Sequence, residues 1–380
     1  MKIGINTFYV VPGDVGGAEY YLMNLLKGLF AIDRDNEYVL FVTPENKDIY
    51  LPPSDNFKMI VLPFSNRKRS VRILFEQTAL PFYVQKEKLD LLHSPNNVAP
   101  LIRNAASVLT IQTLHSFQYE KELPFLKTLY RRMHMRISSR MADHIITPCE
   151  ITRKDAIQIH QLSPERVTSI LDYVSIPILY PDGIHTDHAI LRKYGIKKPY
   201  IFSPSSMFPY KNIQGMLKAL KILQDRFKLP HSLIIAGRDE IGYYPHMKKL
   251  AGELGVLDRF KYIGCVLHEE TPSLYRFADL MLFPSYSETF GIPVLESMAI
   301  GTPIVCSNRS SLPEVAGDGA VQVDPDDVED MCQSIQRLIQ DSEYNKEIVK
   351  KGHERARMFS CENAAKQTLN VYRSVCAARK

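Results

Sequence analysis

The sequence predicts an α/β protein with two doubly wound parallel sheets, one in each half of the chain. Short apolar runs alternate with longer amphipathic segments, as is typical of parallel strands covered by helices on both faces. The alternation lapses around residues 180–194 and then restarts. A length of 380 residues is enough for about two domains of ordinary size.

The first half of the chain supplies the elements of the first sheet. The predicted strands are Lys2–Tyr9, Tyr38–Val42, Lys58–Leu62, Leu89–His93, Ser107–Gln112, His144–Thr147 and Val167–Ile170. The helical patterns between them are Ala18–Phe30, Val71–Lys86, Lys121–Met141 and Glu150–His160.

A linker is predicted at Tyr180–Tyr194, where YPDGIHTDH interrupts the pattern. The second series of strands is predicted at Tyr200–Phe202, Ser232–Ala236, Phe260–Ile263, Leu280–Phe283, Ile304–Cys306 and Ala320–Val323. Its helices are predicted at Lys211–Phe227, Tyr244–Leu254, Glu269–Ala278 and Pro293–Ile300, followed by a helical run over Val328–Lys380.

Composition narrows the class of protein. A hydrophobic content of 45% and a charged content of 23% are typical of a soluble globular chain, and a net charge of +5 permits anionic substrates without requiring them. No run reaches the ~18 apolar residues of a membrane span. The start, MKIGINTFYVVPG, reads as a first strand and not as a signal peptide. The six cysteines show no CxxC spacing, which favours reduced thiols over disulfides or zinc.

The most informative stretch is Pro284–Pro303, which reads PSYSETFGIPVLESMAIGTP. A strand ends in a polar turn, Gly291 lets the backbone approach a ligand, and Pro293 suits a first helical position. The helix start offers unpaired N–H groups and a positive dipole end, which suit a diphosphate. Glu288 lies before the turn and Glu296 is expected in the first helical turn, where it could bind a diol or simply stabilise the dipole.

The Glu-x7-Glu spacing with its inserted Phe-Gly-x-Pro, and the following GTPIVCSNRSSLPEVAGDGA, resemble the family 4 retaining glycosyltransferases. That resemblance implies the GT-B fold, with two Rossmann-like domains facing each other across a cleft. It implies an acceptor-side domain over residues 1–182, a donor-binding domain over 183–359 and a C-terminal helix over 360–380 that returns to the first domain. It also implies a hexose moved with retention from GDP-mannose or a UDP-sugar to a hydroxyl of a polysaccharide or lipid-linked glycan, without a metal or other cofactor.

In that family the turn at Phe290, Gly291 and Ile292 binds the donor. By the same resemblance Glu296 binds the ribose and Glu288 the transferred sugar, and the leaving phosphate itself accepts the acceptor proton.

A glycine-rich loop, VPGDVGGAEYY, lies between the first strand and first helix. Gly16 and Gly17 remove side chains where a backbone approaches another group closely. In the resembled family this loop lies near the donor phosphates and the acceptor. A flexible turn with a helix start at Glu19 is the structural alternative.

The strand before Gln112 carries a departure from the family pattern. Family members often have His-Asp straight after this strand, whereas this chain has Gln112 and Thr113, with His115 following. Either His115 reaches the site from the loop, or Gln112 makes a neutral contact to the sugar or acceptor. Histidine can move protons near neutral pH, which slightly favours His115 as the catalytic group.

The stretch FSPSSMFPYKN also departs from the family. The resemblance predicts an arginine and a lysine directed at the diphosphate, and the arginine position holds Ser206, which carries no charge. Lys211 is expected to open a helix and to neutralise the leaving phosphate.

Acceptor contacts are predicted at His93, Asn96 and Asn97 in LLHSPNNVAP, although Ser-Pro-Asn-Asn is also ordinary turn chemistry.

Two other signals have plain structural explanations. Asp324-Pro-Asp326 resembles a metal-binding pair but precedes a helix, where aspartate is a common cap. The helix over Lys121–Met141 combines a cationic run with an apolar face, which predicts a core-packed helix with a solvated back. The apolar face is Leu126, Leu129, Tyr130, Met133 and Ile137, and the cations are Lys127, Arg131, Arg132, Arg136 and Arg140. Together with the Arg67–Arg69 loop, this run leaves contact with an anionic membrane open.

The expected partners are therefore a nucleotide sugar and a glycan or lipid-linked acceptor, not nucleic acid. The expected location is the cytoplasm, with contact at the inner membrane face left open. A sugar-nucleotide epimerase on the same fold is the alternative function.

Overall fold

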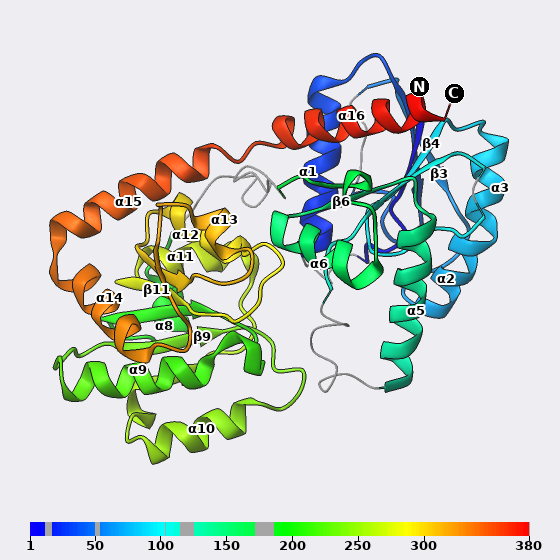
Figure 1. Ribbon diagram of the computed structural model, residues 1–380. Coiled ribbons are helices and arrows are strands. Elements are labelled where there is room, and N and C mark those ends of the chain that lie inside the picture. Colours follow the sequence, from blue (N-terminus) through cyan, green and yellow to red (C-terminus); the bar gives the residue numbers. More distant parts are fainter. Residues whose placement is uncertain (12–16, 50–53, 103, 115–124, 172–185, 380) are drawn as a thin grey trace. The chain divides into compact units, whose positions relative to one another are not determined.

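The computed structural model describes residues 1–11, 17–49, 54–102, 104–114, 125–171 and 186–379 (Figure 1). The chain divides into two compact units, each containing one parallel sheet. Unit 1 comprises Met1–Leu179 and Ser360–Lys380, and unit 2 comprises Tyr180–Phe359. The predicted fold of two doubly wound sheets is confirmed. The expected boundary between residues 182 and 183 lies outside the described residues and stays a prediction.

Within the described residues of unit 1, seven strands form a parallel sheet in the order β3-β2-β1-β4-β5-β6-β7. Their bounds are β1 Lys2–Asn6, β2 Glu37–Val42, β3 Phe57–Val61, β4 Leu91–Ser94, β5 Ala106–Thr110, β6 His144–Thr147 and β7 Val167–Ser169. The helices are α1 Gly17–Ile32, α2 Arg69–Gln77, α3 Ala79–Lys86, α5 Phe125–Met141, α6 Glu150–His160 and α16 Cys361–Ala378, with the 3-10 turn η2 at Pro164–Arg166.

Both faces of this sheet are buried, as its nearly continuous apolar strands predict. On β2, Tyr38 and Leu40 pack with the core shared by α1 and α16. The alternate residues Val39 and Phe41 pack on the opposite face, in the core that includes α3 residues. Alternation along a single strand therefore supplies two separate cores.

The helix predicted over Val71–Lys86 is two helices, α2 and α3, with Thr78 between them. Pro81 explains the break, because its ring clashes with the carbonyl four residues earlier and it has no N–H to donate. That carbonyl belongs to Gln77, the last residue of α2.

The C-terminal helix α16 packs against α1, so its predicted return to the first half of the chain is confirmed (Figure 1). Gly28 makes this close packing possible. A Cβ atom there would lie 2.2 Å from the carbonyl oxygen of Cys361. Tyr372 and Leu369 of α16 belong to the same core as Ile3 and Ile5 of β1.

In the described part of unit 2, six strands form a parallel sheet in the order β10-β9-β8-β11-β12-β13. The strands are β8 Tyr200–Pro204, β9 Ser232–Ala236, β10 Phe260–Tyr262, β11 Leu280–Phe283, β12 Ile304–Ser307 and β13 Val321–Val323. The helices are α8 Ala189–Lys193, α9 Ile213–Asp225, α10 Tyr244–Glu253, α11 Thr271–Arg276, α12 Ile292–Ile300, α13 Leu312–Ala316, α14 Val328–Gln340 and α15 Ser342–Arg357. The 3-10 turns are η3 Pro209–Lys211, η4 Leu257–Arg259 and η5 His268–Glu270.

Each sheet has one point where the strand order reverses. In unit 1 this point lies between β1 and β4, and in unit 2 it lies between β8 and β11. Loops diverge there at the carboxyl ends of the strands, and open α/β sheets bind their ligands at such points. The fold therefore gives one expected binding position in each unit.

Helix α5 does not pack as its sequence pattern predicts. Leu129, Met133 and Ile137 are exposed, whereas Met135 and Ser138 of the same helix are buried. The expectation of a core-packed apolar face is wrong for these three residues, because the polar-looking face lies against the sheet. Among the described helices, none is both long enough and apolar enough to cross a membrane.

The cations of α5 have structural partners. Arg136 donates to the carbonyl of Ile159 at 3.2 Å, and Arg140 donates to that of His160 at 3.3 Å. Both carbonyls belong to the last turn of α6, where a cation complements the negative dipole end. Part of the basic run is therefore explained by contact between two helices.

Candidate functional site

Lys211 and Glu288 meet at the strand-order reversal of unit 2. Lys211 follows β8 and Glu288 follows β11, which are neighbouring strands. Lys211 Nζ donates to Glu288 Oε1 at 2.6 Å, and the two side chains are only 13% and 11% exposed. The structure thus joins two residues that the sequence analysis assigned to separate parts of the donor.

Lys211 is held by the turn that surrounds it. Lys211 is the last residue of η3, and α9 begins at Ile213. The helix predicted to begin at Lys211 therefore begins two residues later. Asn212 has a left-handed backbone and accepts a hydrogen bond from the Gly215 N–H, which caps α9. Lys211 Nζ lies 5.2 Å from the ring centroid of Phe283, a cation–π distance.

Glu288 is held by two serines. Ser310 accepts from the Glu288 N–H at 3.1 Å and donates to its carbonyl, which also accepts from Ser311. Oε1 of the Glu288 carboxylate accepts a hydrogen bond from Lys211. Glu288 Oε2 accepts no hydrogen bond from the described residues, so this oxygen is available to a ligand hydroxyl.

The turn before α12 depends on Gly291. Its φ of 99° is disfavoured for other residues, and a Cβ there would lie 2.5 Å from Leu312 Cδ2. Ile292 is half-buried and begins α12. Phe290 is buried, its ring packs on Phe359 and its carbonyl accepts from Ser311. Any donor contact of this turn is therefore made by backbone groups.

Glu296 lies in the second turn of α12, not in the first turn as expected. The explanation by the helix dipole therefore loses its basis, since that effect is confined to the first turn. The side chain is buried, and Glu296 Oε2 accepts from the Tyr275 hydroxyl at 2.7 Å. Tyr275 of α11 fixes the direction of this carboxylate.

Ser206, at the position where the sequence lacks an arginine, lies half-buried in the loop after β8. The neighbouring Met207 N–H donates to the carbonyl of Arg238, which follows β9. The backbone of Arg238, a residue without a predicted role, therefore lies beside this loop, and its guanidinium lies 3.8 Å from Glu240 Oε1. No local motif marks it, because β9 brings it there from another part of the chain.

In unit 1, Asn97 organises the loop after β4. It has a left-handed φ of 56°, and its Oδ1 accepts from the backbone N–H groups of Gln112 and Thr113 at 2.8 and 3.2 Å. Its Nδ2 donates to Asn96 Oδ1. Gln112 is 5% exposed, so little of its side chain is open to an acceptor. The structure therefore brings Asn97 and Gln112 together, and the hydrogen bond between them stabilises the loop.

Gly16 and His115 lie outside the described residues, and Gly17 is the first residue of α1.

His93, which was predicted to contact the acceptor, does not reach the surface in this structure. Its side chain is fully buried, and both ring nitrogens are used, by the Tyr372 hydroxyl at 2.7 Å and by Thr110 at 2.8 Å. Thr110 in turn contacts the Tyr21 hydroxyl at 2.9 Å. Burial lowers the pKa of His93 to about 3, so the ring is neutral. It is part of a polar network that connects β4 and β5 with α1 and α16.

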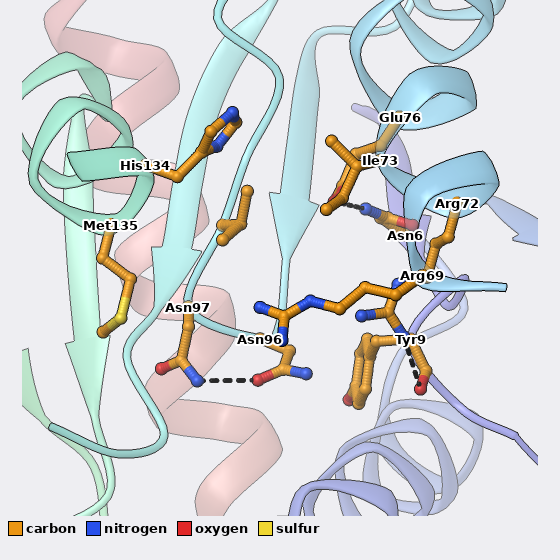
Figure 2. A pocket seen from close by; sticks show the side chains of 11 residues that line it. Asn6, Tyr9, Arg69, Arg72, Ile73, Glu76, Asn96, Asn97, His134 and Met135 are labelled. Atoms are coloured by element: carbon orange, nitrogen blue, oxygen red, sulfur yellow. Dashed lines mark hydrogen bonds between the residues drawn. The ribbon is translucent and has the colours of Figure 1, made fainter. Parts of the chain in front are cut away.

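A polar pocket of about 150 Å³ lies at the strand-order reversal of unit 1 (Figure 2). Its lining comes from the end of β1, from α2, from the loop after β4 and from α5. The lining residues are Asn6, Tyr9, Arg69, Arg72, Ile73, Glu76, Asn96, Asn97, Val98, His134 and Met135. Of these, only Asn96 and Asn97 were predicted from sequence. The spacing of Arg69, Arg72 and Glu76 on one helical face was the signal available.

Asp324 and Asp326, which follow β13, form ion pairs within the protein. Arg309 binds Asp324 at 2.5 Å and Asp326 at 2.7 Å, and Asp327 caps α14 by accepting from the Asp330 N–H. Among the described residues, no cluster of histidine, cysteine and acidic side chains could hold a metal ion.

Comparison with known proteins identifies the family. Residues 187–355 match the family "Glycosyl transferases group 1", and residues 15–171 match "Glycosyltransferase Family 4". O-antigen chain mannosyltransferase B of Escherichia coli is 30% identical over 285 residues, 74% of each chain. The chain belongs to the family 4 glycosyltransferases. It is therefore an enzyme that transfers a sugar from a nucleotide-sugar donor, in a family that is typically retaining and metal-independent.

Two further comparisons extend this result. O-antigen chain mannosyltransferase RfbU of Salmonella typhimurium is 27% identical over 250 residues, which is 66% of this chain and 65% of that protein. The crystal structure of Anabaena HepE in complex with UDP and glucose matches with a TM-score of 0.71 and 19% identity, covering 98% of this chain and 100% of that one. This structural likeness confirms the GT-B fold of the glycosyltransferase.

Proposed function

We propose that this glycosyltransferase moves a mannosyl residue, with retention, from GDP-mannose to a hydroxyl of a lipid-linked precursor of a surface polysaccharide. Two O-antigen mannosyltransferases among its relatives support the sugar and the setting. The Lys211–Glu288 pair at the strand-order reversal of unit 2 carries the assignment of the donor site, because it puts a cation and a free carboxylate oxygen where such folds bind nucleotides.

In this proposal, Lys211 binds the diphosphate of the donor. An ammonium group has three N–H donors, and Glu288 accepts only one of them. The remaining donors bind the phosphate oxygens and stabilise the negative charge that develops as the nucleoside diphosphate leaves. The turn at Gly291 and Ile292 adds the N–H groups of the α12 start, with Ser206 as a further hydroxyl donor.

The two glutamates bind sugar hydroxyls. Glu288 directs Oε2 to the transferred sugar while Lys211 holds Oε1, and Glu296, oriented by Tyr275, accepts from the ribose. Neither glutamate is a proton-transfer partner, because the leaving phosphate accepts the acceptor proton. The acceptor binds to unit 1 at Asn96, in the loop after β4, and the roles of Gly16, Gly17, Gln112 and His115 stay predictions.

The test is a donor panel with a mannose-terminated glycan acceptor, in which GDP-mannose, UDP-glucose and UDP-galactose are compared by product yield. Transfer from GDP-mannose alone, with an axial product linkage seen by NMR, is the expected result. Efficient use of a UDP-sugar instead would replace the donor assignment. An equatorial linkage would overturn retention, and a strict metal requirement would overturn metal-independence.

The same NMR assay without acceptor addresses the epimerase alternative. An epimerase changes the configuration of the sugar while it is still attached to, or released from, the nucleotide, whereas a transferase leaves it unchanged. Appearance of an epimer as the main product would reject glycosyl transfer.

We further propose that the enzyme works in the cytoplasm and that α5 touches the inner membrane face. Leu129, Met133 and Ile137, exposed at four-residue spacing, supply apolar area for this contact. Binding to vesicles containing phosphatidylglycerol should fall several-fold when all three are changed to serine. A control triplet in α15, Glu343, Glu347 and Lys350 changed to serine, should not alter it. Equal vesicle binding by both triple variants would remove the membrane role of α5.

A further inference from the structure

The pocket of unit 1 has an unusual charge balance for a site expected to bind a glycan. Arg69 and Arg72 both line it, and Glu76 is its one acidic lining residue. Among the described residues, no carboxylate lies within ion-pair distance of either arginine. Figure 2 shows the Arg69 side chain extending across the pocket toward Asn96. Two guanidinium groups therefore share a concave site without a direct counter-charge.

Glu76 does not neutralise the arginines in the way a surface ion pair would. It is buried at the back of the pocket and accepts from Asn6 Nδ2 at 2.6 Å (Figure 2). Burial raises its pKa to about 7, even though the nearby Arg72 favours the charged form. Burial lowers the pKa values of both Arg72 and His134, and the nearby charge of Arg69 lowers them further.

The arginines also keep donors for a ligand. Arg72 uses one N–H on the Tyr9 carbonyl at 3.4 Å, and Arg69 makes no hydrogen bond to the described residues. A guanidinium presents five N–H donors in a planar fork that matches the oxygens of a phosphate. A neutral sugar would leave the repulsion between the arginines uncompensated, whereas an oxyanion removes it.

The size of the pocket sets the size of the group. About 150 Å³ is below the ~300–1,000 Å³ typical of sites that enclose a whole drug-sized ligand. The pocket therefore holds one group of a larger molecule. Asn96, whose Oδ1 is used by Asn97, still offers its Nδ2 to a neighbouring hydroxyl.

We infer that this pocket binds a phosphoryl group of the sugar acceptor through Arg69 and Arg72. The inference rests on the proposed transfer reaction and adds the chemistry that recognises the acceptor. Phosphoryl groups of a lipid-linked acceptor and of a water-soluble sugar phosphate share this chemistry, and the test separates the two sources.

The test compares the wild type with the double variant Arg69→Gln/Arg72→Gln, using Arg67→Gln as the matched control. Arg67 is exposed, lies two residues before Arg69 and does not line the pocket. Three acceptors carry the same terminal sugar, attached to an alkyl diphosphate, to a short-chain phosphate or to a neutral alkyl group. The double variant should raise the KM for the phosphorylated acceptors about 30-fold, since charge-assisted hydrogen bonds are lost. The KM for the neutral acceptor and the rate of donor hydrolysis without acceptor should stay within about twofold.

Several results would overturn the inference. Equal use of all three acceptors by the wild type would show that no phosphoryl group is recognised. An equal loss toward all three acceptors would make the arginines structural, and a parallel loss in donor hydrolysis would assign them to the donor. A preference for the alkyl diphosphate over the short-chain phosphate identifies the lipid-linked source.

A binding measurement keeps the inference independent of the reaction. In calorimetric titration with inorganic pyrophosphate, the wild type and Arg67→Gln should show a binding step that the double variant lacks. Identical titrations of all three proteins would overturn the inference, whether or not transfer is observed. A lost step without any transfer would instead count against the proposed function alone.

Discussion

The strand-order reversals of the two units differ in how their charges are matched. In unit 2, Lys211 and Glu288 already form an ion pair, and Glu296 already accepts from Tyr275. In unit 1, Arg69 and Arg72 share a pocket without a paired carboxylate. The same sheet position thus carries a charge-balanced site in one unit and an excess of positive charge in the other. Position in the fold determines where a ligand binds, and the local charges determine its chemistry.

The difference also predicts which residues are needed for stability. A paired cation that is removed leaves a buried carboxylate without its partner, which is costly. Removing a cation that is in no ion pair does not leave a carboxylate without its ion-pair partner. Variants at the two sites should therefore separate loss of activity from loss of stability.

The largest effect is expected at Lys211. Lys211→Met should lower kcat/KM at least about 100-fold by removing charge stabilisation, and should lower the free energy of unfolding by about 3 kcal/mol, because Glu288 remains buried. Lys211→Met/Glu288→Leu should recover most of that stability and none of the activity. Steady-state kinetics and urea unfolding measure the two effects.

Lys218→Met, an exposed lysine of α9, is the control for this series. It should match the wild type in both measurements. If the double variant is as unstable as Lys211→Met, the ion pair is not what stabilises this turn.

The second effect concerns the pH dependence of unit 1. The pKa of Glu76 is raised to about 7, above its value of ~4.3 in an unfolded chain. The folded protein therefore holds a proton that the unfolded chain has released, and this stabilisation is lost as pH rises from about 4.5 through 7. Glu76→Gln has no such proton. Its unfolding free energy relative to wild type should rise by on the order of 3 kcal/mol between pH 4.5 and pH 8.

This difference is read from urea unfolding at several pH values. A constant difference between Glu76→Gln and wild type would show that Glu76 stays ionised throughout. The groups that act on this carboxyl are Arg72, whose charge favours ionisation, and Asn6, whose amide donates to it. A third variant, Arg72→Gln, should shift the window to higher pH.

The smallest effect is expected at the buried network of unit 1. Tyr372→Phe leaves His93 Nδ1 without its partner and should cost about 1–2 kcal/mol of unfolding free energy. Because none of the four side chains of this network lines the pocket, kcat/KM should change less than twofold. Tyr83→Phe, on half-buried Tyr83 of α3, is the control and should be neutral. A tenfold rise in acceptor KM for Tyr372→Phe would restore a binding role for His93.

Sequence reasoning was successful where structure is local. Leu280–Phe283, Ser232–Ala236 and Glu150–His160 were predicted with the bounds observed, because each is a short apolar or amphipathic run with clear ends. The turn at Gly291 and the residues Lys211 and Glu288 were found for a related reason. They lie in a motif whose spacing is visible along the chain.

The remaining features depend on contacts between distant segments. His93 was predicted at the end of a strand with its side chain open to an acceptor, but the hydroxyl of Tyr372, 279 positions later, binds its ring. Arg69 and Arg72, in the first turn of α2, join Asn96 only because the fold places α2 beside the loop after β4. Leu129 and Met133 have the spacing of a core face, and only the packed helix shows which side is buried.

The return of α16 has a consequence for how the chain folds as it is synthesised. Ala365, Leu369 and Tyr372 complete the core of unit 1 but emerge from the ribosome after the whole of unit 2. Unit 2 is contiguous in sequence, so it can fold first, as domains generally do during synthesis. Until α16 is made, the first half of the chain has that face of its sheet only partly covered, by α1. The half of the enzyme that is translated first is therefore the half that finishes folding last.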